Sequence, residues 1–496
     1  MNGLTTWGDG ERRDEVAARG LTRSGGPAAR FATDAEILSP NWRYVPKDPT
    51  LLIGHHRGQL IGLARDDRHA LTVAGSRGGK GISLVVPNLV LWPGSALVLD
   101  PKGELARKTA RARRQVHKQD VVVLDPFGVS GQPPGTNTDS CNLLDGIDLD
   151  APHVVADLQL LLESLIVDNG SQKSGDHWTG GARELVLALC LFAKIHFHRP
   201  TLVTVFEILG GRHGTIMGSI KEPSQVFAAL LETPDLNGAI QAMAIRFLEI
   251  PPEEQGSIVS TARRQLAWLE GLNNPDAAMT RVCQPSDFSL PDLKRRDVTV
   301  YLCLPASYMH AYRPWLRSFV NLAMSALEGT PSRPGAPPVL LMLDEFATLG
   351  YMASLEKAAG LLAGAGVKMW PIIQDLGQLE AIYGKRWGTF IGNAGVTTWH
   401  ALGGDELTAE TLSKRLGITQ YYEPETPHGA FADRARGGML TGGGRWVTDR
   451  VAHPHELERG LARETGQLLA LSPGWPPLLL ERNDITKGFL REYIDE

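Results

Sequence analysis

The feature that most constrains the fold is a series of short apolar runs, each closed by a polar or turn residue. Parallel strands covered by helices on both faces have this pattern, because neither face meets water. Three runs end at acids, Asp100, Asp125 and Asp344, at the strand ends where open α/β sheets bind ligands. The pattern predicts an α/β fold with a mainly parallel sheet. The predicted strands are Leu71–Ala74, Ala96–Leu99, Val121–Leu124, Val298–Leu304, Val339–Leu343, Met369–Ile373, Val396–Trp399 and Leu468–Leu471.

A glycine-rich turn follows the first run and precedes the apolar segment Ile82–Trp92. Strand, glycine-rich turn, lysine and helix together form a phosphate-binding loop, in which backbone N–H groups and the lysine hold phosphates. Ala74 and Gly81 depart from the common pattern G-x-x-x-x-G-K-[ST], and Ser76 or Ser83 is a candidate for the missing metal-binding hydroxyl. An ordinary strand-to-helix turn is the alternative. The predicted phosphate-binding residues are Gly75, Ser76, Arg77, Gly78, Gly79, Lys80, Gly81 and Ile82.

A second motif supports a nucleotide site. The apolar run Val339–Leu343 ends in the acids Asp344 and Glu345. A carboxylate in this position holds Mg²⁺, and the next one orients and deprotonates an attacking water. A buried strand that ends in a solvated acidic pair is the alternative. Together the two motifs predict a P-loop ATPase that uses ATP and Mg²⁺, with Lys80 and Glu345 as catalytic residues and Asp344 as the metal ligand.

Changes in the periodicity of the sequence divide the chain into segments. Residues 1–45 lack useful periodicity and are expected to form a flexible arm. Residues 46–140 and 293–496 form the predicted nucleotide-binding domain, and residues 141–292, which contain helical patterns and no convincing strand, form a predicted all-α insertion. The glycines between Gly437 and Gly444 predict a mobile surface loop.

Several motifs resemble the type IV secretion coupling proteins, the TraG-like family related to the FtsK/HerA motors. The resemblance covers about residues 45 to 485 in the same order. The G-K-G ending of the loop is that family's own variant. The similar segments are residues 74–81 with 85–89, residues 92–104, residues 343–350, residues 374–379 with 383–384, His177-Trp178 with residues 182–185, and Asp405 with residues 408–410.

The resemblance implies a RecA-like ATPase domain that carries an all-α domain and assembles as a homo-hexamer, with the chain monomeric until it assembles. It also implies relaxase–DNA or effector proteins as substrates and type IV secretion channel components as partners. Gln374 would sense the γ-phosphate; capping of a strand is its alternative role. An arginine from a neighbouring subunit usually stabilises the transition state in ring ATPases, and Arg386 and Arg415 are the candidates.

Charge limits how DNA binds. Lys and Arg number 50 against 55 Asp and Glu, a net charge of -5, so a local patch or a pore lining must make any contact. Three groups of basic residues are candidates, and for the first of them, residues 107–118, a solvated outer helix is the alternative. No base-reading module is present, which suits sequence-independent binding. The basic groups are Arg107, Lys108, Arg111, Arg113, Arg114 and Lys118; Arg263 and Arg264; and Arg434, Arg436 and Arg445.

Family members usually carry N-terminal transmembrane helices, and none is recognised here. The uncharged run Gly81–Leu99 contains Pro87, which limits a helix, and is interpreted as a buried helix and strand. We expect a cytoplasmic protein, peripheral at the inner membrane through partners. The four cysteines form no C-x-x-C pair and are expected to be reduced, mostly buried thiols.

Three functions fit these features. The first is an ATP-hydrolysing, DNA-stimulated coupling protein that drives substrates toward a type IV secretion channel. The second is a cytoplasmic FtsK/HerA-like DNA translocase. The third is a nucleotide-binding receptor or adaptor without motor activity, and DNA-stimulated ATP hydrolysis separates it from the other two.

Overall fold

The computed structural model describes residues 29–63, 66–131, 138–167, 173–210, 223–233, 238–272, 274, 277–424, 444–486 and 491. They form two compact units. The first comprises the chain up to Pro46, Thr50–Asn88 and Ile372–Thr486, and the second comprises mainly Leu89–Pro371. Strand β8 (Val367–Ile373) contributes residues to both units.

The first unit contains a mixed sheet with the strand order β2-β1-β13-β12-β9-β3-β8. Strand β3 pairs in parallel with β9 and β8, whereas β9-β12, β12-β13, β13-β1 and β1-β2 pair antiparallel. The parallel strands are fully buried, as their apolar sequences require. The strands are β1 (Leu51–His56), β2 (Gln59–Leu63), β3 (His69–Ala74), β9 (Ala394–His400), β12 (Gln467–Leu471) and β13 (Leu478–Glu481).

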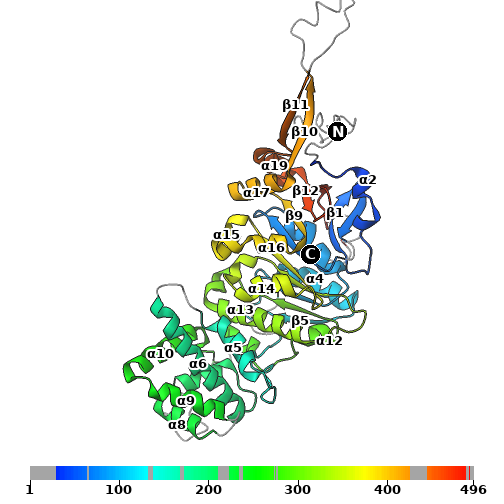
Figure 1. Cartoon of the computed structure of the whole chain (residues 1–496). Helices are drawn as coiled ribbons and strands as arrows, with labels where there is room; N and C mark the ends of the chain where they lie inside the picture. The colour runs from blue at the N-terminus through cyan, green and yellow to red at the C-terminus, as the bar shows by residue number, and fades with distance from the viewer. Residues whose placement is uncertain are drawn as a thin grey trace, which may run out of the picture. The chain divides into compact units, whose positions relative to one another are not determined.

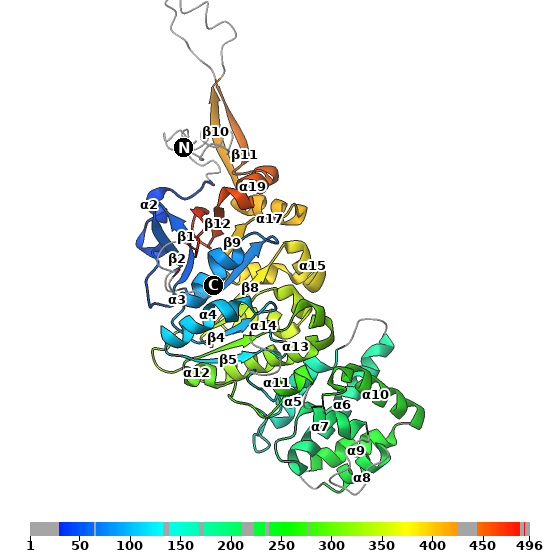
Figure 2. The same ribbon diagram turned by 180° about the vertical axis from the view of Figure 1, so that it is seen from behind.

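A separate antiparallel pair also belongs to the first unit. Strands β10 (Ile418–Pro424) and β11 (Gly444–Arg450) pair over seven positions and project from helices α17 and α19 (Figures 1 and 2). The predicted mobile loop between Gly437 and Gly444 lies almost wholly outside the described residues. The helices of this unit are α2 (Asp34–Ile37), α15 (Leu376–Tyr383), α16 (Gly388–Gly392), α17 (Glu406–Leu416) and α19 (Pro454–Gly460), and α3 (Val86–Leu91) begins in it.

Part of the predicted flexible arm is structured. Thr33 caps α2 through a capping box with Glu36, and Arg30 bonds both oxygens of the Glu36 carboxylate. Ile37 and Trp42 are buried, so residues 34–42 pack against the unit and the prediction of an arm is wrong there. Residues 1–28 lie outside the described residues.

The second unit contains five parallel strands in the order β8-β7-β4-β6-β5. Every residue of β4, β6 and β7 is buried, which matches their uninterrupted apolar sequences. The strands are β4 (Ala96–Leu99), β5 (Asp120–Leu124), β6 (Val298–Leu302) and β7 (Val339–Leu343), and the helices beside them are α4 (Glu104–Gln115), α12 (Asp292–Arg295), α13 (Ala306–Gly329) and α14 (Ala353–Leu361).

Helices fill the segment between β5 and β6. No strand occurs among its described residues. Figure 2 shows α6 to α10 grouped together at one end of the second unit. The helices are α5 (Val154–Leu165), α6 (Lys173–His196), α7 (Leu202–Leu209), α8 (Pro223–Leu231), α9 (Ala239–Glu249), α10 (Pro252–Gln265) and α11 (Ala278–Val282).

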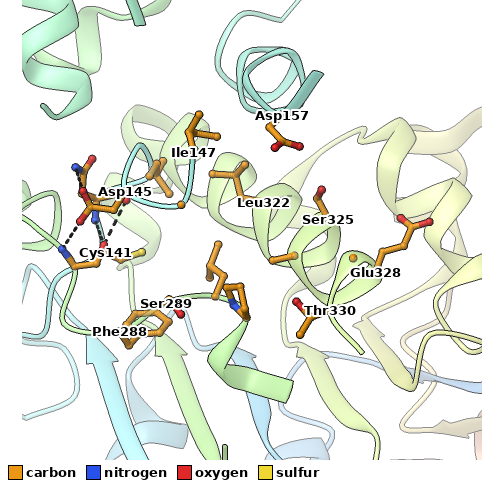
Figure 3. Close-up of a pocket in the computed structure, with 18 of the residues that line it drawn as sticks. Cys141, Asp145, Ile147, Asp157, Phe288, Ser289, Leu322, Ser325, Glu328 and Thr330 are labelled. Carbon is orange, nitrogen blue, oxygen red and sulfur yellow. Dashed lines mark hydrogen bonds between the residues drawn. The ribbon is translucent and has the colours of Figure 1, made fainter. Parts of the chain in front are cut away.

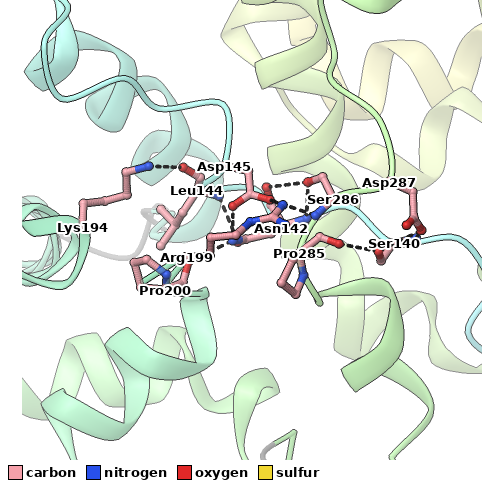
Figure 4. A network of polar contacts seen from close by, with 10 residues as sticks. All are labelled: Ser140, Asn142, Leu144, Asp145, Lys194, Arg199, Pro200, Pro285, Ser286 and Asp287. Atoms are coloured by element: carbon pink, nitrogen blue, oxygen red, sulfur yellow. Dashed lines mark hydrogen bonds and ion pairs between the residues drawn. The ribbon is translucent and has the colours of Figure 1, made fainter. Parts of the chain in front are cut away.

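A polar network ties the two ends of this helical segment together (Figure 4). The Asp145 carboxylate accepts from the Arg199 guanidinium at 2.6 Å and from the backbone N–H of Ser286 at 2.8 Å. The Asn142 amide donates to the carbonyl of Pro200 at 2.8 Å, and the Asn142 N–H donates to the Ser286 hydroxyl. The incoming and outgoing chains are therefore joined to each other and to the turn between α6 and α7.

All eight predicted strands are present, with ends within three residues of the expectation. The sequence interpretation missed β1, β2, β10, β11 and β13. One signal for the β1-β2 hairpin was available: Arg57 and Gly58 both have positive φ, 48° and 79°, and an x-Gly pair is typical of two-residue hairpin turns.

Candidate nucleotide-binding site

The predicted phosphate loop closes on itself and on strand β9. The N–H of Gly75 donates to the carbonyl of Ala401 at 3.1 Å, and the N–H of Gly78 donates to the carbonyl of Gly75 at 3.0 Å. A Cβ on Gly75 would lie 2.4 Å from the Ala401 oxygen, and one on Gly78 would lie 2.6 Å from the Ala401 Cβ. Gly79 has φ +85°, which favours glycine. The glycines are therefore required by packing and by backbone conformation.

Lys80 stands at the start of a π-helical turn, Gly81–Val85, which continues into α3. Pro87, near the start of α3, has no N–H to donate, and the side-chain amide of Asn483 donates to the carbonyl of Ser83 in the preceding turn at 3.2 Å. The Asn88 amide donates to Leu84 O at 2.8 Å and to Leu52 O in β1. Side-chain amides therefore bond the carbonyls of Ser83 and Leu84 beside Pro87.

Gln374 lies beside the loop, immediately after β8. Its side-chain oxygen accepts from the Ser76 hydroxyl at 2.9 Å. The structure therefore brings together two residues predicted for the site, and it engages the Ser76 hydroxyl. The Ser83 hydroxyl, in contrast, is buried and has no hydrogen-bond partner among the described residues. Of the two hydroxyls considered for the metal, Ser83 is the one still available.

His400 is a buried residue that the sequence interpretation missed. It ends β9, pairs with Ala74 across the sheet and is 0% exposed. Neither ring nitrogen has a hydrogen-bond partner among the described residues. Burial lowers the pKa of His400 to about 3, and the cations Arg482 and Lys80 act in the same direction. The imidazole is therefore neutral at physiological pH.

Asp344 and Glu345 follow β7 in the second unit, both partly exposed. Glu345 has φ 55° and ψ 44°, a left-handed conformation that costs a non-glycine residue energy. Its carbonyl accepts from both the N–H and the hydroxyl of Thr348 at 2.8 Å, which stabilises the turn. Such strained positions cluster at functional sites, which favours a role for Glu345 beyond a solvated strand end.

Two further acids follow strands of this unit, Asp100 after β4 and Asp125 after β5. The Asp100 carboxylate accepts from the N–H of Ala106 at 2.8 Å, and burial raises its pKa to about 7, with the Asp344 carboxylate contributing in the same direction. The Asp125 carboxylate accepts from the N–H groups of Val129 and Ser130. Both acids shape the loops at the carboxyl ends of their strands.

The remaining predicted site residues are exposed or sterically free. Arg77 has φ 57° and is exposed, as is Ile82. A Cβ on Gly81 would meet nothing within 4 Å, so the glycine that replaces the usual hydroxyl is not required by packing. Arg386, in a short turn after α15, and Arg415, in the last turn of α17, are exposed.

A cavity of about 570 Å³ lies elsewhere, in the second unit beside the start of the helical segment. Helix α13 contributes Leu322, Ser325 and Glu328 to its lining, together with Ile147 and Asp157 (Figure 3). Its lining mixes apolar residues with polar and charged ones. It contains none of the residues predicted for phosphate binding.

The chain matches the family model for type IV secretory system conjugative DNA transfer over residues 33–425. It belongs to this family. The conjugal transfer protein TraG of Escherichia coli is 28% identical over 96% of this chain and 75% of the relative. Protein VirD4 of Agrobacterium fabrum is 31% identical over 70% of this chain and 49% of the relative. The resemblance to type IV secretion coupling proteins is confirmed.

Solved structures of the plasmid coupling protein TrwB share the fold of this conjugative DNA-transfer protein. The unbound form has a TM-score of 0.66 at 18% identity and covers 94% of this chain and 96% of that structure. The complex of TrwB with ADP and Mg²⁺ has a TM-score of 0.63 at 18% identity, covering 95% of this chain and 99% of that one. The prediction of an α/β fold with a mainly parallel sheet is confirmed.

The basic residues considered for DNA binding differ in their exposure. Arg113 is buried inside α4, so its inclusion in a surface patch was wrong, whereas Arg107, Arg111 and Arg114 on the same helix are exposed. Arg263 donates to the carbonyl of Leu209 at 2.9 Å. Arg434 and Arg436 lie outside the described residues, and Arg445 is exposed on β11. Over the described ranges, no helix is long and apolar enough to cross a membrane.

Proposed function

We propose that this chain binds ATP with Mg²⁺ and hydrolyses ATP to ADP and phosphate to drive relaxase–DNA or protein substrates toward a type IV secretion channel. The observation that carries the proposal is the pinned glycine loop, which presents Lys80 at the start of a helix. TrwB is described in complex with ADP and Mg²⁺ and with a non-hydrolysable ATP analogue, which supports the same ligands here.

Each predicted residue has a distinct role in this proposal. The loop amides of residues 75–82 and Lys80 bind the phosphates, and Gln374 senses the γ-phosphate from beside Ser76. Asp344 holds Mg²⁺, and Glu345 orients and deprotonates the attacking water. Bound Mg²⁺ supplies charge neutralisation on the phosphate oxygens. A carboxylate such as that of Asp344 is a ligand that Mg²⁺ accepts, because Mg²⁺ takes few protein ligands and keeps several waters.

The larger assembly is part of the same proposal. Residues 46–140 and 293–496 form the motor domain, and residues 141–292 form an all-α domain that recruits the relaxase or effector. Six copies form a ring, Arg386 or Arg415 reaches the neighbouring copy's nucleotide, and cations along the pore hold DNA without reading its sequence. On α4, the cations Arg107, Arg111 and Arg114 are exposed.

The direct test is steady-state phosphate release by the purified full chain with Mg²⁺, with and without DNA. We expect DNA to increase the rate, and Lys80→Ala and Glu345→Gln to lower it about 100-fold or more, because each removes a group that acts on the reacting phosphate. Arg111→Ala, on the exposed face of α4, serves as the matched control for ATP hydrolysis without DNA. Equal rates in wild type and both site variants would refute the ATPase.

Transfer in cells tests the coupling role. A strain that lacks the gene is complemented with wild type, Lys80→Ala or Glu345→Gln, and conjugation frequency is measured. We expect only wild type to restore transfer. Restoration by Lys80→Ala would show that the chain acts as an adaptor whose role does not need the energy of ATP.

A further inference from the structure

We propose that Arg482, directly after strand β13, is a positioning residue that orients the phosphate loop for nucleotide binding. The inference rests on the proposed function, because it concerns the same loop. The guanidinium of Arg482 donates to the carbonyl of Gly78 inside the loop and to the carbonyl of Arg463. The backbone N–H of Arg482 donates to the carbonyl of Gly466 at 2.8 Å, so its own main chain is anchored.

The contact with Gly78 fixes the direction of a whole peptide group. A peptide bond is planar and trans, so the carbonyl of Gly78 and the N–H of Gly79 point to opposite sides. When Arg482 holds the carbonyl, the N–H of Gly79 is turned away from the guanidinium. Phosphate loops bind anions through such N–H groups, which must converge on one point. Arg482 therefore selects the orientation that leaves this donor for phosphate.

The local conformation at Gly79 shows why an external clamp is useful. Gly79 has φ +85°. Because glycine populates many backbone conformations, holding Gly79 in this one costs a large conformational entropy. The Arg482 guanidinium lies 3.3 Å from where a Gly79 Cβ would be. A side chain that already fills this space restricts the glycine before nucleotide arrives, and a preorganised loop binds more tightly.

Asn483 extends the clamp to the other side of Lys80. Its amide donates to the carbonyl of Ser83, as described above, while Arg482 holds Gly78. Two consecutive residues thus hold the loop both before and after the lysine. Both contacts span some 400 positions in sequence, namely 404 for Arg482 and 400 for Asn483, so neither follows from the local motif.

The test measures the dissociation constant of Mg²⁺-ADP with a fluorescent ADP analogue, for wild type, Arg482→Ala, Arg482→Lys and Arg463→Ala. We expect Arg482→Ala to weaken binding about tenfold, since it removes a hydrogen bond from a charged donor. Arg482→Lys keeps one donor and should recover part of the loss. Arg463→Ala removes a neighbouring cation but keeps the backbone carbonyl that Arg482 holds, and it should bind as wild type does.

The outcomes separate the possible failures. Equal weakening by Arg463→Ala and Arg482→Ala would assign the effect to general positive charge and overturn the positioning role. Wild-type affinity in Arg482→Ala, with affinity lost in Lys80→Ala, would overturn the inference and leave the proposed function standing. Wild-type affinity in Lys80→Ala would instead refute the nucleotide site itself.

A second measurement guards against simple misfolding. Amide hydrogen exchange of Arg482→Ala, with no nucleotide present, should be faster at Gly78, whose N–H donates to Gly75, and unchanged in β4 and β7 of the second unit. Faster exchange throughout the chain would show that Arg482 is needed for folding and would contradict a role confined to the loop.

Discussion

Glycine at position 75 has a steric cause that is absent at position 81. A methyl group on Gly75 would lie 2.4 Å from the Ala401 oxygen, which is backbone and cannot move aside, whereas one on Gly81 would meet nothing within 4 Å. We predict that Gly75→Ala weakens Mg²⁺-ADP binding more than tenfold by displacing the loop, and that Gly81→Ala stays within about twofold. Titration calorimetry checks both. Equal losses would show that Gly81 is required for a reason other than space.

The buried His400 makes stability depend on pH. Its pKa is about 3 in the folded protein and ordinarily near 6.5 in an unfolded chain, so below pH 6.5 only the unfolded state takes up the proton. The contribution of His400 to the free energy of unfolding is fully present above pH 6.5 and is lost as the pH falls from 6.5 toward 3. At pH 5 the loss amounts to about 2 kcal/mol.

Urea unfolding at pH 7 and pH 5 measures this loss, with His400→Gln as the variant that cannot take up a proton. We predict that the free energy of unfolding decreases from pH 7 to pH 5 in both proteins. The decrease should be about 2 kcal/mol smaller in His400→Gln than in wild type. His455, which is not buried and follows Pro454 in α19, supplies the control variant His455→Gln, which should behave as wild type does. The same decrease in all three proteins would mean that His400 is protonated in the folded state.

Among single residues, those that stand in short sequence motifs could be predicted as site residues from the sequence. Lys80 and Gln374 could be placed because each follows an apolar strand at a known position, and the structure puts Ser76 and Gln374 in contact. Arg482 and His400 could not be placed, because each is a single polar residue after an apolar run. Their importance comes from contacts across the sheet, which no local pattern encodes.

Helix α4 shows how an element can hide a charge. Its sequence suggested a cationic surface, but the Arg113 guanidinium is buried and donates to the carbonyls of Leu89, Trp92 and Gly94 and to the side chain of Gln119. Burial lowers its pKa to about 10. The sequence predicted that this segment is helical. It did not predict that the face with Arg113 packs against α3 and β6, because arginine is rarely buried in a core.

Removal of Arg113 tests whether it stabilises this element. We predict that Arg113→Ala lowers the free energy of unfolding by about 3 kcal/mol or more, because several buried carbonyls lose their donor. Arg111→Ala, two positions away and exposed, should change it by less than about 0.5 kcal/mol. Urea denaturation of the two variants gives the comparison. Similar small effects would mean that water reaches the carbonyls around Arg113.

Two of the strands that the sequence interpretation missed, β1 and β2, are interrupted by glycine. Strands β1, β2 and β13 are short and pair antiparallel, and β1 and β2 carry Gly54 and Gly62 in their interiors. A Cβ at either glycine would approach a neighbouring backbone oxygen within 2.8 Å. Glycine interrupts the apolar run by which a strand is recognised, and here it is present because backbones approach closely.

Across the whole molecule the four cysteines provide a test of how completely the chain is packed. Cys141, Cys190 and Cys303 are buried and all four are free thiols. Burial raises the pKa of Cys141, Cys190 and Cys283 to about 12, and that of Cys303 well above its usual value. The expectation of mostly buried thiols is confirmed.

We predict that a chromogenic disulfide reagent labels none of the thiols of the native protein at pH 8 within minutes and all four in guanidinium chloride. Absorbance of the released thiolate gives the count. The native protein under reducing conditions, followed by removal of the reductant, is the control for prior oxidation. Rapid labelling of one thiol in the native state would identify a unit that opens on that time scale.

The clamp by Arg482 and Asn483 also concerns the order in which the protein is made. The phosphate loop is translated early, but the residues that hold Gly78 and Ser83 follow some 400 codons later. Domains usually fold as units while the chain emerges from the ribosome. Here the glycine loop stays without its clamp until Arg482 and Asn483 have emerged, so a product that terminates between the loop and these residues should bind nucleotide more weakly than the finished molecule.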